Sequence, residues 1–138
     1  MSGIDKDWKI FFLNGKPEMI QVNHWVGEEQ INYTGHRNTI RTFTNIEGRI
    51  RCILPDENVT NIPFSEGEYI ELPKDIDAML DYGSKIAQDF PFVRIDYFYA
   101  SEKLYLGELT FTPGSGFEVL NDELQIELGS ILNLPKER

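Results

Sequence analysis

An Asn-Gly pair at positions 14 and 15 is the sequence feature that most constrains the fold of this chain. It lies between two apolar, strand-like segments, residues 8–13 and 19–22. Asn-Gly between such segments is the strongest short-range signal for a tight β-hairpin. The N-terminal part of the chain is therefore expected to form two antiparallel strands.

Two further hairpins are indicated along the chain. Strand-like segments at 39–45 and 49–54 flank a Glu47-Gly48 turn. The second pair is expected at 93–99 and 103–111, joined by a turn at 100–102. Between the two hairpins, residues 55–72 contain turn-type clusters that are typical of a surface loop.

Two helices complete the predicted architecture. Residues 73–90 carry apolar side chains at three-to-four spacing and are followed by Pro91, which ends a helix. The expected core positions of this helix are Ile76, Met79, Leu80, Ile86, Ala87 and Phe90. A last helix is expected at about 122–132. This order predicts one α+β domain over residues 1–138, with an antiparallel sheet of about six strands and helices packed on one face.

The last predicted hairpin carries an acid pair. Alternation along the strand puts Arg94 and Asp96 on one face, and the hairpin brings Asp96 close to Glu108 on the adjoining strand. Neighbouring carboxylates repel each other unless a positive group lies between them, and Mg²⁺ is one such group. The alternative is an ordinary surface ion pair of Arg94 and Asp96, worth about 0–1 kcal/mol.

Composition narrows the class of protein. With 138 residues, 41% of them hydrophobic, the chain suffices for one domain with its own core. The formal charge of −10 and the absence of a Lys/Arg block argue against a nucleic-acid partner. Cys52 is the only cysteine, so no intrachain disulfide forms and a buried role is expected for it. The sequence shows neither a signal-peptide core nor a long apolar window, so we expect a cytoplasmic protein without a membrane partner.

The residues around the acid pair resemble the end of the ATP-grasp ligases. Arg94 and Asp96, then Glu108 twelve residues further on, then Pro113-Gly114, are similar to the Arg-x-Asp and Glu-x-Asn strands that precede a Pro-Gly loop in that family. Segments 8–17, 89–96 and 107–117 further resemble its TupA-like branch. That branch is associated with bacterial cell-surface polysaccharide and teichuronopeptide synthesis.

This resemblance implies a chemistry: ATP and Mg²⁺ as cofactors, and joining of a carboxylate to an amine through an acyl-phosphate, with small-molecule or glycan substrates. Asp96 and Glu108 would bind Mg²⁺, together with Thr110 at the position where the family has asparagine. Arg94 would be catalytic and steady the transferred phosphoryl group. The loop that contains Gly114 and Gly116 would lie at the cofactor and face the acceptor.

Lys9 and Arg41 are additional candidates for phosphate contacts. Lys9 occupies a first-strand position that is usually lysine in TupA-like chains, and its alternative is an exposed strand lysine without that role. The resemblance covers only the C-terminal lobe of a fold that clamps nucleotide between two lobes. We therefore expect a longer ligase or a partner chain to supply the N-terminal lobe. The alternative function is a non-catalytic binding or scaffold module.

Overall fold

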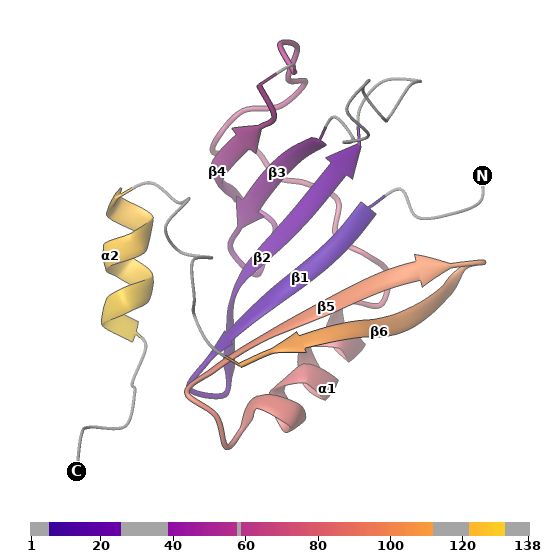
Figure 1. The fold of residues 1–138 in the computed structure, drawn as a ribbon, viewed down its shortest axis with the longest axis vertical. Coiled ribbons are helices and arrows are strands. Elements are labelled where there is room, and N and C mark those ends of the chain that lie inside the picture. Colours follow the sequence, from indigo (N-terminus) through magenta and orange to yellow (C-terminus); the bar gives the residue numbers. More distant parts are fainter. Residues whose placement is uncertain (1–5, 26–38, 58, 112–121, 132–138) are drawn as a thin grey trace.

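The computed structural model describes residues 6–25, 39–57, 59–111 and 122–131. The helices and strands within these ranges are β1 Lys6–Leu13, β2 Lys16–Trp25, β3 Thr39–Thr44, β4 Ile50–Pro55, α1 Ile76–Ala87, β5 Phe92–Ala100, β6 Lys103–Thr110 and α2 Asp122–Ile131. The strands form one six-stranded antiparallel sheet in the order β4-β3-β2-β1-β5-β6 (Figure 1). The predicted α+β fold class and six-stranded sheet are confirmed.

Tight turns join neighbouring strands where the sequence predicts them. Asn14 and Gly15, at φ 55° and 82°, form a two-residue loop, since Leu13 pairs directly with Lys16. Both positive angles are those of the turn that matches the twist of a hairpin. The last hairpin also closes through two residues, Ser101 and Glu102 at φ 52° and 64°, and not through three as predicted.

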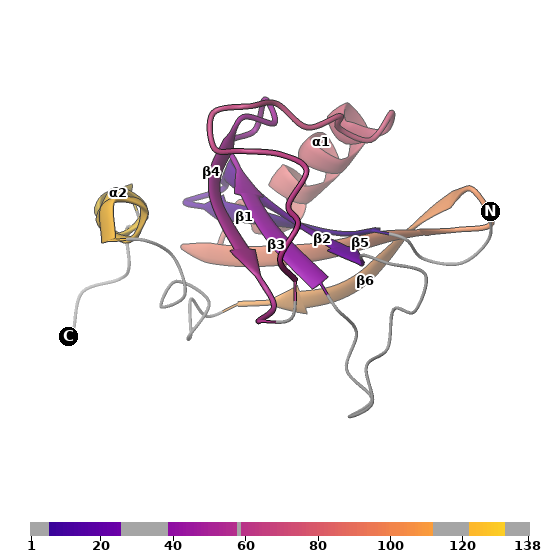
Figure 2. The ribbon, with the colours of Figure 1, turned by 90° about the horizontal axis from the view of Figure 1, so that it is seen from above.

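Helix α1 covers one face of the sheet (Figure 2). Met79 and Ala87 are fully buried there against the side chains of β1, β2 and β5 that point to this face. The hydroxyl of Tyr97 on β5 donates a hydrogen bond of 3.0 Å to the carbonyl oxygen of Met79, which ties the helix to the sheet. Phe90, predicted in this core, is 43% exposed, because the helix ends at Ala87 and Phe90 leaves the apolar stripe.

Gly83 lets α1 lie close to the sheet. A Cβ atom on this residue would lie 2.2 Å from Cζ of Phe12, a side chain of β1 with no exposed surface. Glycine therefore allows the phenylalanine ring to fill the space beneath the helix backbone. Periodicity did not predict this contact, since a glycine has no apolar side chain to count.

The opposite face is apolar at one end and polar at the other. Its apolar end, with Phe11, Phe43 and Phe92, packs against Leu124 and Leu128 of α2. A two-pronged ion pair from Arg51 on β4 to Glu127 joins α2 to the sheet edge. The prediction placed both helices on one face, whereas α2 packs on the face opposite α1. The reason is that this second face also has apolar side chains, which α2 buries.

Neither of the helices described here is long and apolar enough to cross a membrane.

Replacing Gly83 with alanine tests the contact with Phe12. Overpacking of a core costs about 1–3 kcal/mol, whereas alanine gains about 1 kcal/mol over glycine in a helix. The difference is a net loss of up to about 2 kcal/mol in the free energy of unfolding, and we expect the upper end of that range for Gly83→Ala in urea denaturation, because the overlap is with a fully buried ring. Ser84→Ala, next to it on α1, is the control and should change stability by less than about 0.5 kcal/mol.

A double-variant cycle gives the decisive comparison. In the background of Phe12→Leu, whose shorter side chain leaves room beneath the helix, Gly83→Ala should cost less than in the wild-type chain. An equal cost in both backgrounds would show that the two residues are not coupled.

Candidate functional site

The polar end of the second face carries a line of side chains at directly opposed positions on four strands. From the sheet edge inward these are Glu108 on β6, Asp96 on β5, Lys9 on β1 and Gln21 on β2. We call this line the polar row. Two of its members, Asp96 and Gln21, are buried although they are polar. A buried carboxylate needs charged or hydrogen-bonding partners, so the surroundings of Asp96 decide what the site can do.

Asp96 is held by two cations. Arg94 donates from Nε to Oδ1 at 2.9 Å and from Nη2 to Oδ2 at 3.1 Å, as a two-pronged contact along the same strand. Lys9 donates from Nζ to Oδ2 at 3.0 Å across the β1–β5 pair. Only 9% of the Asp96 side chain is exposed, so these contacts are stronger than those of a fully solvated surface pair.

Lys9 bridges two carboxylates. Besides its contact with Asp96, its ammonium lies 2.9 Å from Oδ2 of Asp7, two residues earlier on the same face of β1. The Lys9 side chain is only 15% exposed. Lys9 is therefore a largely buried member of this ion-pair cluster and not an exposed strand lysine, whereas its contact with phosphate stays a prediction. Asp7 is a member of this cluster that the sequence did not single out.

The hairpin pattern predicts Glu108 close to Asp96 on the adjoining strand, and in the structure the two residues pair directly. Unlike Asp96, Glu108 is exposed, and it makes no ion pair within the described residues. Thr110, half-buried, lies opposite Arg94. The positive groups that offset the acid pair here are thus Arg94 and Lys9, and both contact Asp96 and not Glu108.

A β-bulge at Gly107 sets the pairing of the two acids. Continuing the register of the two-residue turn would place Gly107 opposite Asp96 and turn Glu108 to the α1 face; instead Tyr97 pairs with Leu106 and Asp96 pairs with Glu108. One extra residue on β6 is the definition of such a bulge. A Cβ at Gly107 would lie 3.3 Å from the Phe98 ring, so glycine also leaves space for that ring.

The bulge brings an aromatic pair to the edge of the site. Phe98, two residues beyond Asp96, pairs with Tyr105, and their rings stack at 5.5 Å with 17° between planes. Tyr105 is 44% exposed. Strict alternation from Glu108 would have turned Tyr105 to the α1 face, and the isolated glycine inside the strand was the one signal for the change.

The remaining candidates lie further away or outside the described residues. Arg41 on β3 pairs with Asn23, and Asn23 pairs with Asp7, so Arg41 is on the same face but two strands, about 10 Å, from β1. Gly114 and Gly116 fall within residues 112–121, outside the part of the chain that the structure describes.

The oxygen atoms present fit a magnesium ion that keeps other ligands. Three hydrogen bonds already reach Asp96, and a carboxylate has about four acceptor positions. Glu108 adds an exposed carboxylate opposite it, and Thr110 adds a hydroxyl. Among the described residues no group of three or more His, Cys, Asp or Glu side chains could hold a metal. Mg²⁺ suits such a partial set, because it usually retains waters and phosphate oxygens.

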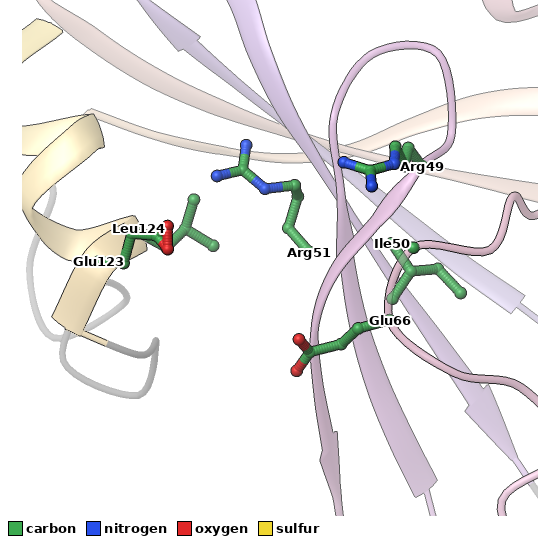
Figure 3. A pocket seen from close by; sticks show the side chains of 7 residues that line it. Arg49, Ile50, Arg51, Glu66, Glu123 and Leu124 are labelled. Atoms are coloured by element: carbon green, nitrogen blue, oxygen red, sulfur yellow. The ribbon is translucent and has the colours of Figure 1, made fainter.

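A separate pocket of about 320 Å³ lies at the other end of the sheet, between β4 and α2 (Figure 3). Its charged lining side chains are Arg49, Arg51, Glu66 and Glu123. Arg51 is already engaged by Glu127, and that guanidinium lowers the pKa of the Glu127 carboxyl below its usual value. No residue of the polar row lines this pocket.

Comparison with known protein families identifies the family of this chain. The family model described as TupA-like ATPgrasp matches residues 2–133. No curated protein and no solved structure matches the chain.

The two acids should respond differently to neutralisation. Asp96→Asn leaves Lys9 and Arg94 close together without their shared anion, so we expect a loss of about 2 kcal/mol in the free energy of unfolding. Glu108→Gln changes an exposed side chain without an ion pair in the described structure, and should stay within about 0.5 kcal/mol of wild type. Urea denaturation without divalent cations measures both. Equal effects would contradict the asymmetry between Asp96 and Glu108.

Proposed function

Because the chain belongs to the TupA-like ATP-grasp family, we propose that the polar row binds Mg²⁺ and the phosphates of ATP, and that the protein serves an ATP-dependent carboxylate–amine ligation. One observation carries this proposal. Asp96 and Glu108 face each other on neighbouring strands, while Arg94 and Lys9 lie on the same face beside them. Oxygen ligands for a cation and cationic groups for phosphate thus meet at one place.

Each side chain has a proposed task. Asp96 and Glu108 would hold Mg²⁺, with Thr110 as a neutral oxygen beside them. When bound, the metal neutralises charge on phosphate oxygens. Arg94 offers a planar guanidinium that is fixed by its two bonds to Asp96 and is 24% exposed, so one side of it remains accessible to a phosphoryl group. Lys9 and, further along the face, Arg41 would add positive charge for the phosphates.

The stacked rings of Phe98 and Tyr105 offer an apolar surface beside the polar row. They lie two residues outward from Asp96 on the same face, so a nucleotide whose phosphates lie at the polar row has a flat apolar surface within its length. Aromatic rings stack favourably on other planar rings. The polar row and the aromatic pair together would hold the two chemically different ends of ATP.

The proposed reaction needs more surface than this sheet face offers. Within the part of the chain that the structure describes, a nucleotide at the polar row would contact the sheet on one side only. We propose that a second lobe, on the same polypeptide or on a partner chain, closes over it and excludes water. The ligated carboxylate and amine would be small molecules or glycans of cell-surface polysaccharide assembly, made in the cytoplasm.

One observation favours a second function. Asp96 uses both of its oxygen atoms in internal ion pairs, as a purely structural carboxylate does. A binding or scaffold module that retains the ATP-grasp sheet without its chemistry would show the same contacts. The two functions differ in whether Mg²⁺ and nucleotide bind here.

Thermal unfolding with Mg²⁺ and a non-hydrolysable ATP analogue tests the ligase proposal. At a hundred times the dissociation constant, a ligand adds about 2.7 kcal/mol of stability, which raises the melting temperature by several degrees for a domain of this size. We expect the shift for wild type and its loss in Glu108→Gln, which removes a metal ligand without removing an ion pair.

The matched control is Glu71→Gln, an exposed glutamate in the loop before α1, which should shift like wild type. No shift for wild type, even with the second lobe present, would favour the scaffold function. A full shift in Glu108→Gln would show that nucleotide binds without the acid pair.

A further inference from the structure

We infer that Lys9 is the resident counter-ion of the proposed metal site, competing with the divalent cation for Asp96, and that Asp7 holds the Lys9 ammonium when the cation binds. This inference rests on the proposed function and adds the control of metal affinity to it. It concerns an ion-pair triad on two neighbouring strands, Asp7, Lys9 and Asp96, whose contacts are 2.9 and 3.0 Å.

The competition follows from which oxygen Lys9 occupies. Its ammonium donates to Oδ2 of Asp96, the same atom that accepts from Nη2 of Arg94, so this oxygen already carries two cationic donors. A divalent cation at Asp96 would lie next to the ammonium and be repelled by it. Of the two cations, Lys9 is the one that can leave, because its single donor group sits on a flexible stem whereas Arg94 is held by two parallel bonds.

Asp7 gives the displaced ammonium a second partner. It lies on the same face of β1, and its carboxylate already contacts Lys9 at 2.9 Å, so Lys9 needs only a small movement to leave Asp96 while keeping an ion pair. The cluster contains three carboxylates, Asp7, Asp96 and Glu108, and two cations, Lys9 and Arg94. Its net charge is therefore −1, which favours binding of an added cation. Asp7 would thus be a positioning residue that acts through Lys9.

Binding of Mn²⁺ alone, measured by electron paramagnetic resonance of the uncomplexed ion, tests the competition without nucleotide or activity. We expect Lys9→Met to tighten Mn²⁺ binding by about tenfold, because the competing charge is gone. Asp7→Asn should weaken it by several-fold, since Lys9 then has only Asp96. Lys9→Gln keeps a hydrogen-bond donor to Asp96 and should also tighten binding, which serves if the methionine variant folds poorly.

An exposed Lys–Asp ion pair elsewhere on the chain supplies the controls. Lys85→Met and Asp81→Asn remove the two charges of an exposed pair on α1, on the other face of the sheet, and should leave Mn²⁺ binding at the wild-type level. The inference requires that Mn²⁺ affinity rises in the Lys9 variants and falls in Asp7→Asn. Residues with a merely structural role would not change the affinity in opposite directions.

The remaining outcomes are also decisive. Mn²⁺ binding by Lys9→Met but not by wild type would support the inference in its strongest form. Equal or weaker binding by both Lys9 variants, with wild type binding normally, would overturn the inference and leave the proposed function standing. Absence of binding in wild type and in both Lys9 variants would overturn the inference, whereas the proposed function is judged separately by the melting-temperature shift with Mg²⁺ and nucleotide analogue.

Discussion

Strand β1 is the element on which both faces of the molecule depend. It lies between β2 and β5, so it joins the N-terminal hairpins to the C-terminal one. Its alternate residues serve different layers: Ile10 and Phe12 fill the core beneath α1, whereas Phe11 and Leu13 fill the core on the other face. The same alternation places Lys9 on the second face, opposite Asp96. The register of one pair, β1 with β5, therefore determines both the packing of the cores and the assembly of the charged site.

The sequence predicted the elements well and the packing between them less well. Alternation, the Asn-Gly turn and the helical spacing depend on residues close together in the chain, and these predicted the strands, α1 and the proximity of Asp96 and Glu108. Their direct pairing depends in addition on the bulge at Gly107. The contact of Lys9 with Asp96 joins residues 87 positions apart, and nothing local indicates which strand β5 will pair with. Gly83 and Gly107 were missed because each matters through the neighbour that it leaves room for, Phe12 and Phe98.

The charged site shows how a sheet can keep a carboxylate buried before any ligand arrives. Burying Asp96 alone would be costly, and the chain offsets this with cations from its own strand and from the next one. Glu108, on the edge strand, remains in contact with water and needs no such partner. The two acids thus differ in environment although they face each other, and this asymmetry follows from the position of each strand in the sheet.

The extra residue at Gly107 links the length of the tip loop to the pairing of the acids in the β5–β6 hairpin. The tip and the base of this hairpin follow registers that differ by one residue, and the bulge is where the difference is absorbed. A related chain with the same spacing between its two acids, but with three residues in the tip loop, could pair them in the same way without a bulge. Loss of the glycine with an unchanged tip would also preserve the acid pair. In homologues, the length of the tip and the presence of this glycine should therefore be read together when the two acids are aligned.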